Sequence, residues 1–311
     1  WNYNQIFNYQ YYDRNYIDIN IDQNGSNITN NLSKEHSYEY EISLNKKIGF
    51  DELNLGFELI EIKYQNYRTG NKKFSTDIIS IFSQYDTEIL NDYNVIIGLR
   101  FDKYSDYNIV YSPRIAIMKT LNRWKFRTSI GKGFRTPSFM ERFMEFYNAG
   151  DGYYVTGNSS LLPEKSIGGT LGLEYLKPNS YQISILINHT KFTDHIVEKY
   201  QGPDTIEGIE TNAYSFYNID NTYSSLEIRG KWKASNIISA SWEINFLDNR
   251  DENGTSIPNT PPLTICNGYD YKSPTHPFGL TLNTKWTQSY TPAIHDIDLG
   301  WKYDNERNPF I

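Results

Sequence analysis

The stretch from residue 131 to residue 175 begins GKGFRTPSFMERF and ends GNSSLLPEKSIGGTLGLEY, with a run rich in glycine and tyrosine between the two blocks. Residues 123–133 alternate apolar and polar side chains, which is the period of a β-strand with two different faces. Pro137 cannot donate a backbone hydrogen bond to a sheet, so the strand should end before it. We therefore expect a strand, a loop over residues 134–165 and a second strand over residues 166–176.

Alternation of the same kind recurs along the whole chain and is the main signal for secondary structure. Helical periodicity of comparable strength is absent, although a short helix is compatible with the loop around residues 138–147. Several predicted strands reach the about 9–11 residues that a tilted strand needs to cross a bilayer. The predicted strands lie near residues 3–22, 36–46, 52–68, 73–88, 93–103, 109–119, 123–133, 166–176, 180–200, 212–233, 237–249, 277–288 and 294–303.

The predicted connections differ in length between the two ends of the sheet. Short connections are expected near residues 47–51, 89–92, 120–122, 177–179, 234–236 and 289–293. The opposite end carries long connections near 23–35, 134–165, 201–211 and 250–276, and two short ones near 69–72 and 104–108. An up-and-down outer-membrane barrel has this asymmetry, with brief periplasmic turns and long extracellular loops. The sequence therefore predicts an all-β, antiparallel, transmembrane barrel.

The composition is compatible with such a barrel but does not require it. The 311 residues include 27 Tyr and 16 Phe, and the mean hydropathy is −0.63. No run of about 18 apolar residues occurs, which excludes a transmembrane helix. A membrane β-strand turns only every second residue to lipid, so its mean hydropathy can be polar. The composition by itself favours a soluble, tyrosine-rich β protein, and a secreted protein that binds carbohydrate through its aromatic residues is one alternative.

Charge and cysteine content narrow the range of partners. A net charge of −7 and a pI near 5.3 argue against nucleic acid, and the single cysteine, Cys266, excludes an intrachain disulfide and a thiolate metal cluster. On a barrel, one charged face would line a wet lumen or contact an internal plug, whereas in a soluble sheet it would face solvent. The residues predicted on this face are Lys125, Arg127, Glu227, Arg229, Lys231 and Lys233.

No group of residues has the spacing of a catalytic, cofactor or metal site. Ser138 lacks a GxSxG setting. The histidines, His36, His189, His195, His276 and His295, show neither HxxxH nor HExxH spacing. His189 and His195 share one face of a regular strand and face apart only if the strand is irregular, so a metal pair there is a minor alternative. We predict no catalytic residue, no cofactor and no resident metal.

The two blocks resemble the hallmark barrel segment of TonB-dependent outer-membrane receptors. In that family G-x-G-F-R-x-P-S-x-x-E ends one strand, and G-N-x-x-L-x-P-E-x-S leads into the next. Weaker matches are VIIGLRFD from residue 95, SPR from residue 112, YNIDNTYSSLE from residue 217 and NTPPL from residue 259. We expect structural roles for most of the matched residues, with Gly131 and Gly133 allowing close strand packing or bending. The matched residues are Gly131, Gly133, Phe134, Arg135, Pro137, Ser138 and Glu141, then Gly157, Asn158, Leu161, Pro163, Glu164 and Ser166.

The resemblance implies a barrel of about 22 strands, of which residues 1–311 form one part. The plug domain and the TonB-contacting motif of the family are not seen in this sequence. Residues 1–20 lack the pattern of a signal peptide, and the odd number of predicted strands leaves both sheet edges unpaired. We therefore expect an internal portion of a longer receptor, mature or truncated.

The function implied is active import across the outer membrane of a Gram-negative bacterium. The expected partners are the TonB energy-coupling complex through a plug, a scarce nutrient, outer-membrane lipid and a surface lipoprotein. A passive barrel, or a barrel that works as a scaffold for partner proteins, is the first alternative, and the soluble carbohydrate-binding protein is the second.

Ligand contacts are expected in the long loop after residue 133. Tyrosine and arginine suit planar or anionic metal chelates through stacking and charge-assisted hydrogen bonds. The alternative is that the aromatic residues form an interfacial girdle and that Arg135 and Glu141 only close the loop. No histidine lies between Phe134 and Leu161, where haem receptors of this kind usually carry one, so a ferric siderophore or a cobalamin-like cargo is favoured over haem. The candidate residues are Arg135, Glu141, Arg142, Tyr147, Asp151, Tyr153 and Tyr154.

Overall fold

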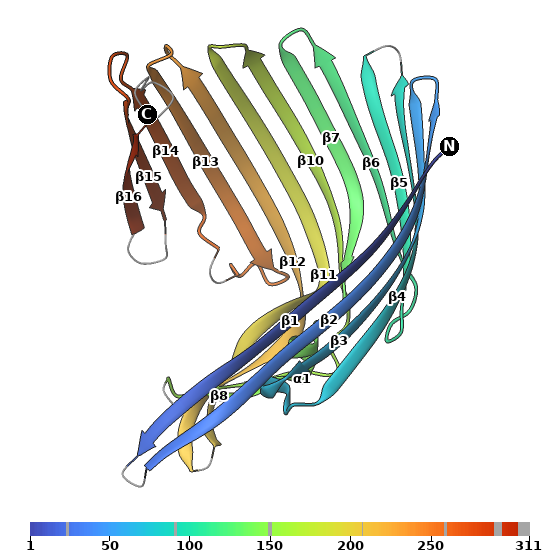
Figure 1. Cartoon of the computed structure of the whole chain (residues 1–311), viewed down its shortest axis with the longest axis vertical. Helices are drawn as coiled ribbons and strands as arrows, with labels where there is room; N and C mark the ends of the chain where they lie inside the picture. The colour runs from blue at the N-terminus through green and yellow to red at the C-terminus, as the bar shows by residue number, and fades with distance from the viewer. Residues whose placement is uncertain are drawn as a thin grey trace.

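The alternating sequence forms one curved, antiparallel sheet in the computed structural model of the protein (Figure 1). The structure describes residues 1–22, 25–89, 92–148, 151–206, 208–257, 260–288 and 294–303. Its elements are β1 (Asn2–Asp22), β2 (Gly25–Ile48), β3 (Asp51–Asn66), the 3-10 helix η1 (Tyr67–Thr69), β4 (Lys73–Ile89), β5 (Tyr93–Tyr104), β6 (Val110–Leu121), β7 (Trp124–Arg135), α1 (Phe139–Phe143), β8 (Glu145–Asn148), β9 (Tyr153–Thr156), β10 (Glu164–Lys177), β11 (Tyr181–Ile206), β12 (Ile209–Lys233), β13 (Ile238–Asp251), β14 (Leu263–Lys272), β15 (Phe278–Thr287) and β16 (Ile294–Tyr303).

Neighbours in the sheet follow chain order from β1 to β16, with β7 next to β10. Every pair on this path is antiparallel, which confirms the up-and-down arrangement. Within the described part of the chain, no ladder joins β16 to β1. The described residues also contain no helix that is long and apolar enough to span a membrane.

Two of the predicted long loops are wrong because they are strand. The described part of 23–35 belongs to β2, and most of 201–211 belongs to β11 and β12, so these hairpins project at one end of the sheet (Figure 1). Their polar sequences lack an apolar face and therefore resemble loops. A separate two-stranded hairpin is only marginally stable in water, but these ends continue ladders that the rest of the sheet already holds in place.

The predicted loop 250–276 is also wrong, because it contains β14. Leu263, Ile265, Tyr269 and Tyr271 alternate with other residues in this strand, but Asn267–Gly268 imitates a turn. The additional strand reverses the direction expected for β15 and β16. The predicted short turn 289–293 lies outside the described residues. The short strands β8 and β9 inside the long loop were not predicted either.

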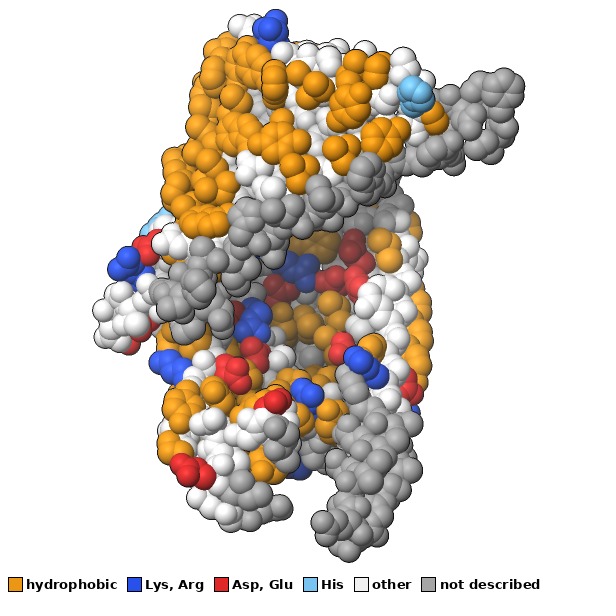
Figure 2. All heavy atoms as spheres, turned by 90° about the vertical axis from the view of Figure 1, so that its left-hand side faces the viewer, with side chains coloured by type: hydrophobic (Ala, Val, Ile, Leu, Met, Phe, Trp, Pro, Cys, Tyr) orange, Lys and Arg blue, Asp and Glu red, His pale blue; other side chains and the backbone are white. Residues whose placement is uncertain are grey.

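The two faces of the sheet differ in polarity. Few apolar side chains are buried: among the described residues these are Val95, Val155, Leu161 and Ile196. Large apolar side chains are exposed instead along the outer face, and Figure 2 shows them covering the outer surface of the strands towards the short-turn end. A soluble protein would bury such a surface, whereas a membrane barrel turns it to lipid. Examples are Ile79, Ile81, Ile97, Phe101, Phe126, Ile130, Leu171 and Ile187.

The inner face carries hydrogen-bonded charges. Arg100 donates to Asp102 at 2.7 Å and to Ser80 at 2.8 Å, and it also pairs with Glu58. Ser80 is fully buried and donates to Asp102 at 2.6 Å. This network satisfies charges that would otherwise be costly to remove from water.

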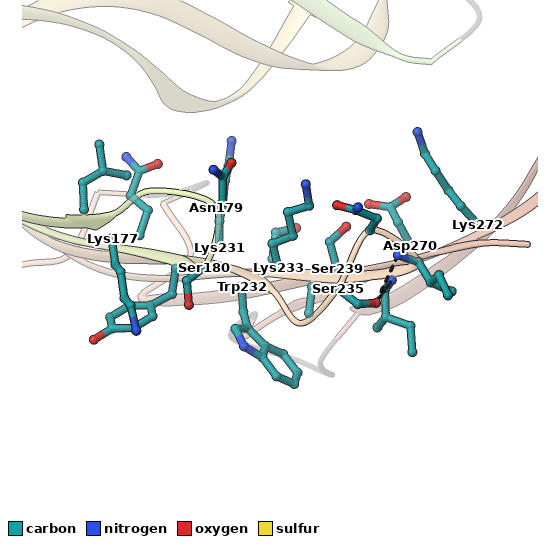
Figure 3. A pocket seen from close by; sticks show the side chains of 18 residues that line it. Lys177, Asn179, Ser180, Lys231, Trp232, Lys233, Ser235, Ser239, Asp270 and Lys272 are labelled. Atoms are coloured by element: carbon teal, nitrogen blue, oxygen red, sulfur yellow. Dashed lines mark hydrogen bonds between the residues drawn. The ribbon is translucent and has the colours of Figure 1, made fainter. Parts of the chain in front are cut away.

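The charged face predicted from the sequence lies on this inner side. Arg127 pairs with Glu174 at 3.1 Å, and Arg229 pairs with Glu227 at 2.9 Å. Lys231 and Lys233 line an open cavity of about 630 Å³ near the short-turn end. Lys233 points to the opposite side of the sheet from Trp232, which faces outward (Figure 3). The alternation along β12 therefore separates a polar lumen from an apolar exterior.

Candidate ligand-binding loop

The end of β7 is fixed to the start of β10 by one arginine. Arg135 and Glu164 are directly opposite in the β7–β10 ladder. The Arg135 guanidinium donates from Nε and Nη2 to the two carboxylate oxygens of Glu164, both at 2.7 Å. It also donates from Nη1 and Nη2 to Glu141, at 2.9 and 3.0 Å. One planar guanidinium therefore binds two carboxylates that are 23 residues apart in the sequence.

Helix α1 presents Glu141 to this arginine. Ser138 is the N-cap, and its hydroxyl accepts from the Glu141 N–H at 3.2 Å, while Glu141 Oε2 accepts from the Ser138 N–H at 2.7 Å. This capping box starts the helix immediately after the buried Pro137. Burial opposes ionisation of Glu141, but hydrogen bonds from Arg135 and Ser138 outweigh it, so the pKa of Glu141 is lowered. The carboxylate stays charged and holds both the helix and the arginine.

The returning loop packs directly against the backbone of α1. The Gly157 N–H donates to the Met144 carbonyl at 2.6 Å, and the Asn158 N–H donates to the Glu141 carbonyl at 2.8 Å. A Cβ at Gly157 would lie 2.5 Å from the backbone nitrogens of Phe143 and Met144. Glycine is therefore required here by close backbone approach.

Strand β12 holds the same loop from the other side. Asn158 donates to the Phe216 carbonyl at 2.9 Å. The Asn218 side chain accepts from the Leu162 N–H at 2.8 Å and donates to the Leu162 and Asp194 carbonyls at 3.0 and 2.6 Å. Leu161 is only 3% exposed between these contacts. The sequence motif around Asn218 was recognised, but nothing in it indicated that this side chain holds a loop 56 residues away.

The loop crosses the concave side of the sheet. Phe139 stacks on Tyr64 and Phe74, with ring centroids 5.5 and 5.4 Å apart, and Phe143 stacks on Phe74 at 4.4 Å. At its other side, β9 pairs with β12 as a parallel ladder. Residues 136–163 therefore link β3 and β4 to β12, and α1 and β8 lie at the long-loop end in Figure 1. We call residues 136–163 the bridging loop.

The remaining candidate ligand residues lie on the bridging loop in two different settings. Arg142 donates to Asp106 at 2.9 Å and lies over the ring of Tyr107, whose pKa is raised by burial. Tyr147 and Tyr154 are opposite each other in the β8–β9 hairpin. Tyr153 meets Phe146 and Tyr214 edge to face, at 6.1 and 6.3 Å.

The candidate residues differ in whether their side chains are already engaged by other groups of the protein. Arg135, Glu141 and Arg142 are occupied by ion pairs within the protein. Asp151 is exposed and accepts a hydrogen bond from Asn148 at 2.8 Å. Within the described ranges, no hydrogen bond engages the hydroxyls of Tyr147, Tyr153 or Tyr154, which are half-buried. The geometry leaves these tyrosines as the groups that are open to a ligand, and ligand contact by any of the candidates stays a prediction.

Arg68 contacts the bridging loop, and the sequence did not predict this contact. It follows β3, and its guanidinium lies 4.0 Å from the ring centroid of Phe146 on the bridging loop. It also donates to the Tyr67 hydroxyl at 2.9 Å. No local pattern marked Arg68, because its partner is 78 residues further along the chain.

His195 also lies behind the bridging loop. A bulge between Phe192 and His195 shifts the register of β11 against β12. His195 consequently faces Glu164, with Nε2 3.8 Å from Oε1, whereas His189 is exposed and contacts Ser224 at 2.8 Å. The strand is irregular, and the two histidines do not form a pair.

Among the described residues, one group of carboxylates has the spacing of metal ligands. Oxygen atoms of Glu39, Glu41 and Glu58 lie within 4.8 Å of one another. Glu58 already pairs with Arg100, so this group belongs to the charged network of the inner wall.

The match to a known protein family includes the residues described above. Residues 2–308 match the model of the family described as TonB dependent receptor-like, beta-barrel. The chain belongs to this family. Its members are receptors and transporters of the Gram-negative outer membrane, and the apolar outer face of this sheet lies in that membrane. The soluble, carbohydrate-binding alternative is not supported.

Three similar proteins illustrate the relationship. A probable TonB-dependent siderophore receptor PirA from Acinetobacter baumannii is 23% identical over 225 residues, covering 64% of this chain and 30% of the relative. An iron-regulated outer membrane virulence protein from Vibrio cholerae is 26% identical over 174 residues, covering 53% and 27%. The crystal structure of the siderophore receptor PirA from Pseudomonas aeruginosa is 18% identical with a TM-score of 0.75, covering 96% of this chain and 55% of that one. The aligned part of this chain thus covers less than a third of the length of these two relatives, and about half of the solved structure.

Proposed function

We propose that this chain forms part of the wall of an outer-membrane receptor that captures a ferric siderophore or similar metal chelate and imports it with energy supplied through TonB. The observation that carries the proposal is the bridging loop, which is held on both sides of the concave face at the long-loop end. A loop in this position narrows the entrance and presents its side chains to whatever enters from outside.

The chemistry of the exposed side chains supports a chelate as the ligand. Tyr147, Tyr153 and Tyr154 offer aromatic faces and unengaged hydroxyls, and Arg68 supplies a cation beside Phe146. Aromatic rings stack on planar groups and a guanidinium forms charge-assisted hydrogen bonds with anionic ones, so these side chains suit a planar or anionic metal chelate. Relatives named as siderophore receptors agree with this class of cargo.

Further parts of the receptor are needed for this activity. We infer that residues 1–311 belong to a single β-barrel domain whose remaining strands lie elsewhere in the protein, because β1 and β16 each pair on one side only in the described residues. We also infer a plug that fills the polar lumen and carries the contact with TonB. Lipid surrounds the wall, and a surface lipoprotein is a further expected partner. No step in this mechanism makes or breaks a covalent bond, so the protein is not an enzyme.

Uptake of radioactive iron tests the proposal. Cells lacking the gene would be compared with cells that express it, with and without TonB, using catecholate and hydroxamate ferric siderophores and haem labelled with radioactive iron, and cobalamin labelled with radioactive cobalt, as cargo. We expect iron uptake from at least one ferric siderophore to require both the gene and TonB. A passive barrel would instead give an open conductance in planar bilayers and uptake that does not depend on TonB, and that result would reject the proposal.

A further inference from the structure

Three lysines lie close together on the outer face of the sheet near the long-loop end. Lys132 is on β7, Lys165 on β10 and Lys191 on β11, which are consecutive strands in the sheet, and all three are exposed. Lys132 lies two residues from the exposed Ile130, and Lys165 lies two residues from the exposed Ile167. Because side chains alternate between faces along a strand, these lysines share the outer face with the isoleucines and point away from the lumen.

The registers of the ladders place the lysines around one isoleucine. Ile167 is opposite Lys132 in the β7–β10 ladder and opposite Lys191 in the β10–β11 ladder. Lys165 is two positions nearer to the bridging loop on the same face of β10. Directly opposed side chains in a sheet are about 5 Å apart, so three ammonium groups are available to one small anion. All three lysines line a groove of about 420 Å³ together with Tyr111 and Ile167.

The positive charge of this group is only partly balanced. Lys165 pairs with Asp194 at 3.3 Å. Lys132 lies over the ring of Tyr111, at 4.9 Å, and donates to its hydroxyl at 3.4 Å. In the part of the chain that the structure describes, no carboxylate pairs with Lys132 or Lys191. Unbalanced cations on a surface that faces lipid are costly unless an anion from the membrane neutralises them.

The group also lies at the boundary between lipid and water. The exposed Ile130, Leu171 and Ile187 occupy the same face on the side away from the loop. Beyond the lysines the strands end or continue into polar hairpins. A molecule with acyl chains that contact the apolar surface and a phosphate that contacts the lysines would fit this boundary.

We propose that Lys132, Lys165 and Lys191 bind the phosphate of a phosphorylated lipid of the outer leaflet, with its acyl chains on the apolar surface below. The chain therefore has a lipid site on its outer wall that is separate from the ligand path through the lumen. The lysines hold the receptor at a fixed depth and attract a specific shell of anionic lipid.

Binding of fluorescent diphosphorylated lipid A to the detergent-solubilised protein tests this site. Replacing the three lysines together, as K132Q/K165Q/K191Q, should weaken binding at least about tenfold, because three charge-assisted contacts are lost. The charge-conserving K132R/K165R/K191R protein should bind within about twofold of the parent, since arginine also binds phosphate. A matched control, K231Q/K233Q/K272Q, removes three lysines from the inner face and should leave lipid binding unchanged.

Two further measurements separate the interpretations. Heat-modifiable gel mobility would verify that each variant is folded. The parent protein should bind lipid A without phosphates weakly, with the same affinity that the glutamine variant has for diphosphorylated lipid A. Inorganic phosphate should fail to displace diphosphorylated lipid A from the parent. Equal binding by the parent and the glutamine variant, equal affinity for the lipid without phosphates, or displacement by inorganic phosphate alone would overturn the proposal.

Discussion

The wall of the sheet from β4 to β7 and the bridging loop are stabilised in different ways. In the wall, each strand repeats the same alternation, the backbone ladder supplies the hydrogen bonds, and lipid rather than a protein core covers the outer side chains. The bridging loop has only the short β8–β9 and β9–β12 ladders, and its buried apolar side chains among the described residues are Val155 and Leu161. It depends on individual side chains, above all Arg135, Glu141 and Asn218. Single substitutions outside the Arg100 network should therefore be tolerated in the wall, whereas substitutions of these individual side chains should be costly for the loop.

The largest effect is expected from Arg135→Ala. It leaves two partly buried carboxylates, Glu141 and Glu164, close together with no cation between them. Leaving buried charged groups without their partner costs on the order of 2–3 kcal/mol, which would release the loop from the wall. Hydrogen exchange of the Gly157 and Asn158 amides should become at least tenfold faster, while amides of β5 and β6 keep their protection. Unchanged exchange at Gly157 would show that Arg135 does not hold the loop.

Gly157→Ala should produce the next largest effect. The new Cβ would overlap backbone atoms of α1 at 2.5 Å, which cannot move as a side chain can. Such overpacking typically costs about 1–3 kcal/mol. Limited proteolysis should then cut the bridging loop in the variant and spare it in the parent.

The matched control for this substitution is Gly98→Ala in the wall. A Cβ there meets its nearest atoms at 3.8 Å, which is ordinary contact. The control should resist protease as well as the parent does. Equal sensitivity of the two variants would contradict the difference between wall and loop.

Asn218→Ala should have a smaller but measurable effect. It removes two hydrogen bonds to Leu162 and one to Asp194, and each such bond contributes about 1 kcal/mol or less at this exposure. Iron uptake from a siderophore that the parent transports should fall several-fold. Asn188→Ala, on the inner wall of β11, should leave uptake unchanged.

A pH dependence is expected from Glu141. The pKa of Glu141 is lowered in the folded protein, so its ionised carboxylate stabilises the folded loop at pH values above the ordinary pKa of a glutamate. This stabilisation is lost as the pH falls through the lowered pKa. Protease resistance of the loop should be constant from neutral pH down to about pH 5 and decrease below about pH 4. Glu141→Gln should already be sensitive at neutral pH and respond less to acid, and a parent-like pH profile in this variant would assign the dependence to another group.

The wall was largely predictable from the sequence and the contacts of the loop were not, for a physical reason. Alternation along β5, β7 and β10 is a local property that the sequence displays directly. Strand β14 was missed because Asn267–Gly268 resembles a turn, although Pro261 and Pro262 mark its start. The first part of β2 and the β11–β12 hairpin end were missed because their sequences are polar and show no regular apolar alternation.

In the loop, the motif residues were found by resemblance and their partners were not. The pairing of Arg135 with Glu141 was considered from the sequence because they are six residues apart. The second carboxylate, Glu164, and the anchoring Asn218 come from other strands. Their positions relative to Arg135 depend on the register of the sheet, which no local pattern determines.

A crosslink between the bridging loop and β12 tests the central claim most directly. Thr156 and Ser215 are opposite each other in the parallel β9–β12 ladder, and Ser215 donates to the Thr156 carbonyl at 2.9 Å. Thr156→Cys and Ser215→Cys would be combined with Cys266→Ser, which removes the chain's only other cysteine. A loop that bridges the sheet predicts nearly complete disulfide formation under mild oxidation in intact cells, and little for a mismatched pair of Thr156→Cys with Ser239→Cys. Crosslinking no greater than in the mismatched pair would show that the loop does not rest on β12, and the account of a held bridging loop would be wrong.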